Sequence, residues 1–182
     1  MRRSGIRSER AKVANVAPGK SPREPGVPES GDSMLPYLRS GALSQTRGFR
    51  LLPHTADIRV EVRGKNLAGL YAAGVEALFS LMVDRRSVRA AAARSFTVSG
   101  NDPEERLFLL LREALLLFSL DGFLVRTARA TIKNTDVEMK VSGEPFDPSR
   151  HAASREIKAV TAHGMTVRRV PGGCVARFIV DV

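Results

Sequence analysis

A chain of 182 residues that is 43% hydrophobic and 26% charged is long enough for one globular domain with a buried core, plus some unstructured sequence. Its 29 Lys and Arg residues outnumber its 19 Asp and Glu residues, which gives a formal net charge of +10. The single cysteine, Cys174, excludes an internal disulfide and is typical of a protein in the reducing cytoplasm, so we expect a cytoplasmic location.

The first 48 residues predict a disordered basic arm. They hold scattered arginines and the segment APGKSPREPGVPESGDS, without an apolar period. Ten Lys or Arg and four acidic residues lie in the stretch up to Arg50, a net of +6 (10 − 4), so residues 51–182 carry +4 (19 − 15). The arm has no apolar stretch of signal-peptide length; a transit peptide or a translation start at Met34 are alternative interpretations. We expect the folded domain over residues 49–182.

The first part of the domain predicts a strand followed by a helix. Apolar residues alternate with charged ones from Ile58, and Gly64 ends the pattern, as in a half-buried strand. Asn66 can cap a helix whose apolar residues recur at helical spacing from Leu67 to Met82, with Gly74 as a weak point inside.

A short strand and a second helix are expected next. The segment RSFTVSG has the pattern of a strand. Asp102, Pro103 and Glu105 form the start of a leucine-rich helix that Gly122 ends. Arg112 and Glu113 divide this helix into apolar runs of five residues, far below the roughly 18 of a membrane span.

From Phe123 onward the sequence predicts strands and turns. The expected strands are FLVRTARATI, DVEMKVSG, EIKAVTAHG, MTVRRV and CVARFIVDV, with PGG at 171–173 in the last hairpin. Two helices and a C-terminal block of strands predict an α+β fold. We expect a mostly antiparallel sheet with the two amphipathic helices packed on one face.

The positive charge raises the question of nucleic-acid binding, since clustered cations release counterions from phosphates. In residues 51–182, however, the arginines are dispersed among acidic residues, without the aromatic interleaving of single-strand binders. We interpret them as a solvated surface and keep a basic RNA-binding or chaperone module as an alternative.

The carboxylates at the two ends of the domain are candidate metal ligands. Asp57 opens the first predicted strand, Asp181 closes the last, and Val182 adds an α-carboxylate. If those strands are neighbours, three oxygen donors converge, a set that prefers Ca²⁺ or Mg²⁺, or Mn²⁺, over zinc. The residues alone leave a plainer interpretation open, in which Asp57 accepts turn N–H bonds and Asp181 is a solvated strand end.

Four segments resemble the archease family: HTADI at 54–58, GEPFD at 143–147 followed by His151, EIKAVTAHGMTV at 156–167, and the terminal FIVDV. The resemblance covers residues 49–182 and not the arm. Ala152 and Ala162 depart from it, because the family usually has an acidic residue and a tyrosine at these two positions.

The resemblance implies a function. Archeases are small protein cofactors of the GTP-dependent tRNA-splicing RNA ligase; they speed guanylylation of its active-site histidine and allow repeated turnover. The family's metal-binding acidic positions fall on Asp57 and on Asp181 with the terminal carboxylate of Val182. The implied cofactor is a divalent cation, Ca²⁺ first, with Mg²⁺ or Mn²⁺ as alternatives.

It also implies partners and supporting residues. We expect direct binding to the ligase, contact with RNA through the ligase, and no membrane association. His54 is expected to shape its turn or to hydrogen-bond to a metal ligand. The residues expected to support the site or contact the partner are His54, His151, Glu156, Lys158 and His163. An independent metal-dependent enzyme acting on phosphate esters is the alternative activity.

Overall fold

The computed structural model describes residues 47–52 and 57–182. The expected arm up to residue 46, and His54, lie outside the described residues. The described elements, in chain order, are β1 (Arg47–Leu52), β2 (Ile58–Gly64), α1 (Leu67–Met82), β3 (Ala92–Ser99), α2 (Pro103–Asp121), β4 (Phe123–Lys133), β5 (Asp136–Pro145), β6 (Ala159–Val170) and β7 (Gly173–Asp181).

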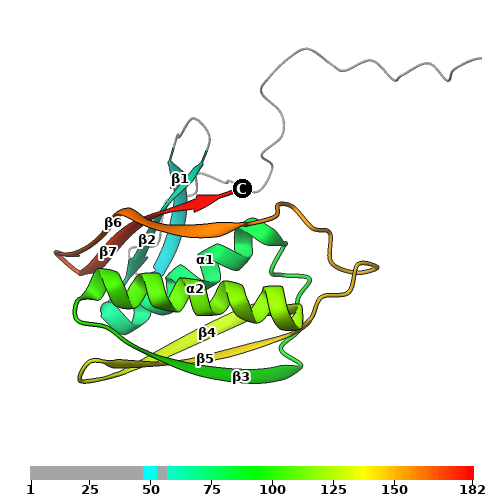
Figure 1. Ribbon diagram of the computed structural model, residues 1–182, viewed down its shortest axis with the longest axis horizontal. Coiled ribbons are helices and arrows are strands. Elements are labelled where there is room, and N and C mark those ends of the chain that lie inside the picture. The colour runs from blue at the N-terminus through cyan, green and yellow to red at the C-terminus, as the bar shows by residue number, and fades with distance from the viewer. Residues whose placement is uncertain (1–46, 53–56) are drawn as a thin grey trace, which may run out of the picture. The chain divides into compact units, whose positions relative to one another are not determined.

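The strands form two antiparallel sheets, with the helices between them (Figure 1). One sheet has the order β1-β2-β7-β6 and the other the order β3-β5-β4. α1 contacts β2 and β4, and α2 contacts β6 and β3, so each sheet has the helices on one face and leaves its other face outward. The α+β class with antiparallel strands is therefore confirmed; the division of the strands into two sheets was not anticipated.

Both predicted helix starts are confirmed by side-chain caps. The Asn66 side chain accepts a hydrogen bond from the Gly69 amide at 2.8 Å, and that of Asp102 accepts one from the Glu105 amide at 2.7 Å. Glu105 Oε2 in turn accepts from the Asn101 amide at 2.7 Å, one residue before the cap. Gly122 ends α2 with a left-handed φ of 63°.

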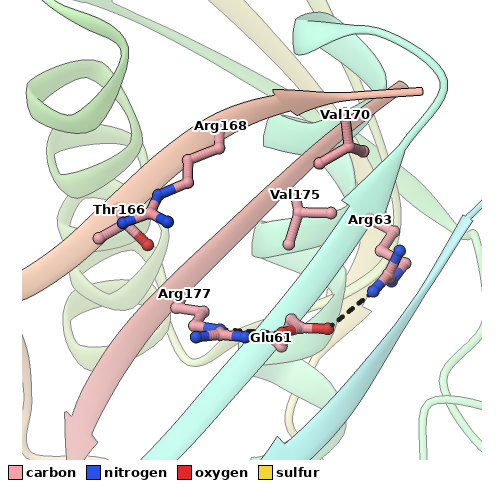
Figure 2. A pocket seen from close by; sticks show the side chains of 7 residues that line it. All are labelled: Glu61, Arg63, Thr166, Arg168, Val170, Val175 and Arg177. Carbon is pink, nitrogen blue, oxygen red and sulfur yellow. Dashed lines mark hydrogen bonds and ion pairs between the residues drawn. The ribbon is translucent and has the colours of Figure 1, made fainter. Parts of the chain in front are cut away.

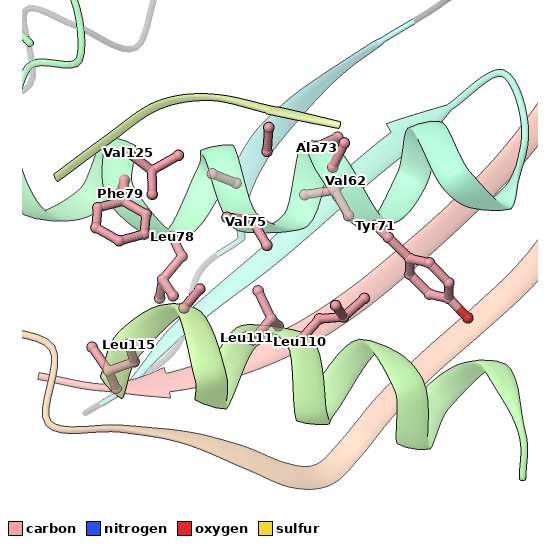
Figure 3. Close-up of a cluster of buried hydrophobic side chains, with 14 of the residues drawn as sticks. Val62, Tyr71, Ala73, Val75, Leu78, Phe79, Leu110, Leu111, Leu115 and Val125 are labelled. Carbon is pink, nitrogen blue, oxygen red and sulfur yellow. The ribbon is translucent and has the colours of Figure 1, made fainter. Parts of the chain in front are cut away.

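The apolar faces of the helices meet in the core (Figure 3). Leu78 and Phe79 of α1 and Leu110 and Leu111 of α2 are fully buried there. Burying each such side chain contributes about 1.5–3 kcal/mol relative to leaving it exposed. No helix in the described part of the chain is long and apolar enough to cross a membrane.

Two strands differ from the sequence prediction. β1 was missed because its short alternation, with Leu51 facing Val60 on β2, adjoins the arm and looks like part of it. EIKAVTAHG and MTVRRV were expected as separate strands, but from Ala159 onward they form the single strand β6, whose register on β7 shifts between Thr161 and Thr166. The positive φ of Gly164, 70°, lies inside this irregular stretch.

Candidate functional site

The candidate metal ligands lie at one end of the four-stranded sheet. β2 and β7 pair antiparallel, with Ile58 opposite Val180, so Asp57 immediately precedes this pair on one strand and Asp181 immediately follows it on the other. Asp57 is half-buried and Asp181 is exposed. The condition set by the sequence, that the two strands are neighbours, is met.

Lys158, the residue before β6, joins the same end of the sheet. Its amide donates to the carbonyl of Asp181 at 2.9 Å, and its ammonium Nζ donates to the backbone oxygen of Val182 at 3.0 Å. Ala159 then pairs with Asp181 across β6 and β7. Val182 is half-buried and packs against the core, which fixes the position of its main-chain oxygen.

This donor set fits a hard divalent cation by its chemistry. Asp57 and Asp181 offer carboxylate oxygens and Val182 a backbone oxygen, the ligand types that Ca²⁺ and Mg²⁺ prefer. The Val182 backbone oxygen already accepts a hydrogen bond from the positively charged Lys158 ammonium, so it is accessible to a cationic group. Within residues 47–52 and 57–182, no group of three or more His, Cys, Asp or Glu side chains is gathered to hold a metal, so such a cation would depend on these mixed donors and on water.

The remaining expected residues divide between two places. Glu156 is exposed and lies two residues before Lys158. His163 is exposed in the irregular stretch of β6. His151 lies elsewhere, in the loop after β5, and is 1% exposed.

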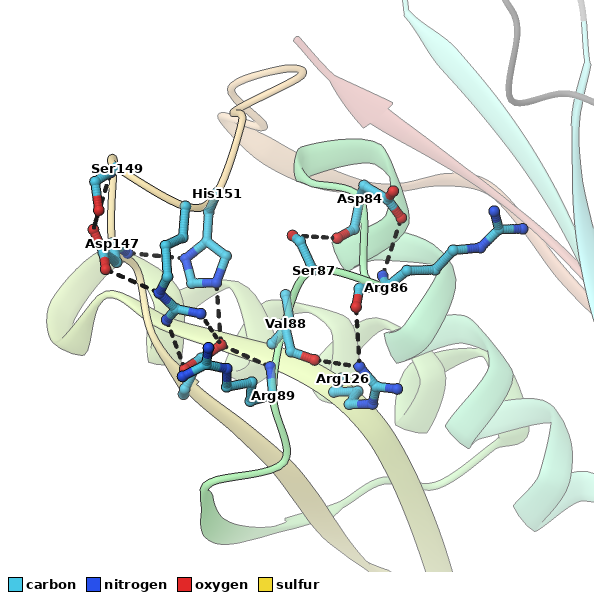
Figure 4. A network of polar contacts seen from close by, with 11 residues as sticks. Asp84, Arg86, Ser87, Val88, Arg89, Arg126, Asp147, Ser149 and His151 are labelled. Carbon is cyan, nitrogen blue, oxygen red and sulfur yellow. Dashed lines mark hydrogen bonds and ion pairs between the residues drawn. The ribbon is translucent and has the colours of Figure 1, made fainter.

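His151 belongs to a polar network built around the buried Glu144 (Figure 4). Its Nε2 lies 3.1 Å from Glu144 Oε1, and its Nδ1 accepts from the Asp147 amide at 2.9 Å. That acceptor role places the ring proton on Nε2, so Nε2 donates to the carboxylate. Arg150 Nη2 donates to Glu144 Oε2 at 2.8 Å, and the Arg89 amide donates to Oε1 at 2.7 Å.

The contacts of the network lower the pKa values of its two carboxyl groups. The hydrogen bond from Arg150, followed by that from the Arg89 amide, lowers the pKa of Glu144 to about 2. Hydrogen bonds from the hydroxyl and the amide of Ser149 lower the pKa of Asp147 to about 2. Both groups are therefore ionised at neutral pH, and the single positive charge of Arg150 pairs with both of them.

The network joins two parts of the chain that are distant in the sequence. It links the end of β5, the loop after it and the connection between α1 and β3, to which Arg89 belongs. Next to the network, the Ser154 amide donates to the backbone carbonyl of Met82, and Val83 forms an isolated antiparallel β-bridge with Ala153. The sequence analysis did not predict Glu144 as the centre of a polar network. The motif GEPFD carried the family resemblance, but nothing in the sequence shows that its glutamate is buried.

Comparison with known proteins identifies the family. The model of the Archease protein family matches residues 49–182. The chain belongs to the archease family.

Curated archeases match nearly over their full length. The archease of Pyrococcus abyssi is 31% identical over 134 residues, which cover 71% of this chain and 94% of that protein. That of Thermococcus gammatolerans is 34% identical with the same coverage. The resemblance drawn from HTADI, GEPFD, EIKAVTAHGMTV and FIVDV is thereby confirmed.

Two solved structures share the archease fold. The solution structure of protein 1598 of Methanobacterium thermoautotrophicum has a TM-score of 0.64 and 26% identity, covering 74% of this chain and 99% of that one. The crystal structure of a Thermotoga maritima archease, described as a possible chaperone, has a TM-score of 0.54 and 17% identity, covering 73% of this chain and 96% of that one. The second likeness concerns the fold alone.

Proposed function

We propose that this archease is a cytoplasmic protein cofactor that activates a GTP-dependent RNA ligase in tRNA splicing or RNA repair. It would promote guanylylation of the ligase and multiple turnover without catalysing the joining itself. The observation that carries the proposal is the juxtaposition of Asp57 and Asp181 at adjoining ends of β2 and β7, in a chain of the archease family.

The acidic end of the four-stranded sheet is the proposed working surface. Asp57, Asp181 and the backbone oxygen of Val182 would hold a divalent cation, Ca²⁺ first, with Mg²⁺ or Mn²⁺ as alternatives. When bound, the cation would supply positive charge next to the phosphates of the nucleotide. Lys158 keeps Val182 in place, and the exposed Glu156 and His163 are available for contact with the ligase.

Guanylylation joins the ligase histidine to the α-phosphorus of GTP, and pyrophosphate leaves. The step needs the attacking nitrogen, phosphorus and leaving oxygen in line, so help comes from positioning and charge neutralisation. The archease can act by ordering the ligase's own metal site. Alternatively, it can bind the competent conformation of the ligase more tightly than the inactive conformation.

The test is a guanylylation assay with labelled GTP and substoichiometric archease. We expect a faster rise of guanylylated ligase and more than one joining event per ligase molecule. Archease with Asp57→Ala should have no effect, whereas Asp121→Ala, which removes an exposed carboxylate at the end of α2, should act like the wild type. RNA joining by archease without ligase, surviving repurification, would overturn the proposal.

A further inference from the structure

The outward face of the four-stranded sheet carries a shallow pocket of about 230 Å³ at the opposite end of β2 from Asp57 (Figure 2). Three adjoining strands line it: β2, β7 and β6. The lining residues are Glu61, Arg63, Thr166, Arg168, Val170, Val175 and Arg177. Nothing in the described part of the chain packs on this face, because both helices contact the other face.

The pocket is built on one buried carboxylate. Glu61 is 2% exposed although it lies on the outward face, because arginines of its own and of neighbouring strands cover it. Arg50 Nη2 and Arg177 Nε each lie 2.9 Å from a Glu61 oxygen, and Arg63 Nη2 lies 3.2 Å away. Burial alone would raise the pKa of Glu61, but hydrogen bonds from Arg50, Arg177 and Arg63 outweigh it and leave the pKa lowered.

One carboxylate cannot neutralise this many guanidinium groups. The side chains of Arg50, Arg63 and Arg177 remain 50%, 44% and 52% exposed, so their other N–H donors face solvent. Arg168 is exposed and has no ion pair or hydrogen bond among the described residues. Glu61 thus fixes three guanidinium groups in place while leaving the face with a net positive charge.

The register distributes the arginines across the whole sheet. Each strand contributes one: Arg50 from β1, Arg63 from β2, Arg177 from β7 and Arg168 from β6. Neighbouring strands lie about 4.8 Å apart, so the row extends about 14 Å. A single small anion would contact one or two of these groups, whereas an extended polyanion can contact all four.

We propose that this row of arginines binds the phosphate backbone of single-stranded RNA. The planar guanidinium fork pairs with phosphate oxygens through two parallel N–H bonds, and Thr166 adds a hydroxyl donor. No aromatic side chain lines the pocket, so bases are not stacked and binding is independent of sequence. The choice of RNA over an acidic peptide rests on the proposed function, in which RNA is the ligase's substrate.

The chain's own arm is a poor occupant because its charge has the same sign. Residues 1–46 contain eight Lys or Arg and four acidic residues, a net of +4 (8 − 4).

The sequence alone does not predict this surface, since Arg50, Arg63, Arg168 and Arg177 are dispersed along the chain and only the sheet brings them together. The surface adds a direct RNA contact to the indirect one expected through the ligase.

The test measures binding of a short fluorescent oligouridylate by the full chain, without ligase, from about 50 to 200 mM salt. Arg168→Glu should weaken binding about five- to tenfold at low salt, and Arg168→Ala should reduce the slope of log K against log salt by about 0.7. Arg168→Lys keeps the charge and should stay within about threefold of the wild type. Arg168 suits the test because its removal leaves Glu61 with all its contacts.

The matched control is Arg129→Glu. Arg129 is exposed on β4 of the three-stranded sheet, and the substitution changes the net charge by the same amount. Equal losses for Arg168→Glu and Arg129→Glu would overturn the proposal, as would tighter Arg168-dependent binding of a polyglutamate peptide of equal charge. Guanylylation of the ligase needs no RNA. A negative result in the RNA-binding titration therefore does not contradict the activator function, and a negative result in the guanylylation assay does not contradict RNA binding at this surface.

Discussion

The Lys158 ammonium donates to the backbone oxygen of Val182 at 3.0 Å, across the end of the four-stranded sheet. The amide of the same residue also donates to the Asp181 carbonyl, so the residue just before β6 holds the end of β7. The Lys158 ammonium therefore already contacts one of the proposed cation ligands, the Val182 oxygen. Whatever cation binds beside Asp57 and Asp181 must share or displace this ammonium.

Removing either carboxylate should abolish stimulation of the ligase. Asp57→Ala and Asp181→Ala each remove a charged oxygen donor that the remaining ligands cannot replace. We expect divalent-cation affinity and ligase guanylylation to fall by about tenfold or more, with stability within about 0.5 kcal/mol of the wild type because neither side chain belongs to the core. Cation titration and a guanylylation time course measure both effects.

His54→Ala provides the comparison for the two carboxylates. Removing a histidine that shapes the turn or supports a ligand should reduce ligase stimulation less than removing a ligand itself. Equal and complete loss for His54→Ala, Asp57→Ala and Asp181→Ala would instead indicate that histidine and aspartate act together chemically. Retained stimulation in Asp181→Ala would remove the end of β7 from the site.

Lys158 should weaken cation binding by competing for Val182. Lys158→Met removes a positive charge while keeping an unbranched side chain, so we expect calcium or manganese affinity to rise several-fold near neutral pH. Lys158→Arg keeps the charge and should leave the affinity close to that of the wild type. Isothermal titration of the three proteins measures the difference; weaker binding in Lys158→Met would mean that the lysine is needed to position Val182.

Local sequence signals predicted most of the fold. Asn66, Asp102 and Gly122 act on their own helix ends, so their roles follow from residue type and spacing. The alternation from Ile58 to Gly64 likewise predicts a strand without knowing its neighbours. The sequence could not divide the strands between two sheets, because that depends on which strand pairs with which.

The sites depended on the same long-range information. From the residues alone, the approach of Asp57 and Asp181 depended on their strands being neighbours, and the family resemblance favoured it; the β2–β7 pairing meets that condition. Glu61 looked like an ordinary solvated residue in the pattern RVEVR, because its partners Arg50 and Arg177 come from other strands. Burial of a charged side chain is a tertiary property, and alternation within one strand does not reveal it.

Deleting residues 1–46 should leave both the fold and ligase stimulation nearly unchanged. The deletion stops before β1, whose Leu51 packs beside Val60 on the inner face of the sheet. The arm carries no core-forming pattern, so we expect the thermal midpoint and the guanylylation rate to stay at wild-type values. A matched deletion through residue 52 removes β1 and should lower the midpoint; equal effects of the two deletions would mean that the arm also contributes to folding.

The Glu144 network should make stability depend on pH in the acid range. The folded-state pKa of Glu144, about 2, lies below the ordinary glutamate pKa of 4.5. A depressed carboxyl pKa contributes stability that is fully present above the unfolded-state pKa and is lost as the pH falls through the folded-state pKa. The loss should therefore run from about pH 4.5 down to about pH 2, as protonation removes the charge that Arg150, Arg89 and His151 contact.

Glu144→Gln tests this origin of the pH dependence. Glutamine keeps the shape and one acceptor oxygen but cannot ionise, so its urea midpoint should be lower than that of the wild type at neutral pH and should fall less between pH 4.5 and 2. Asp147, whose pKa is also lowered to about 2, remains in both proteins and supplies the residual slope. His151→Ala should destabilise the fold by about 2–4 kcal/mol at neutral pH, because it leaves a cavity, removes the acceptor of the Asp147 amide and takes one hydrogen bond from Glu144. Parallel pH profiles for wild type and Glu144→Gln would place the acid sensitivity elsewhere, in Glu61 or Asp147.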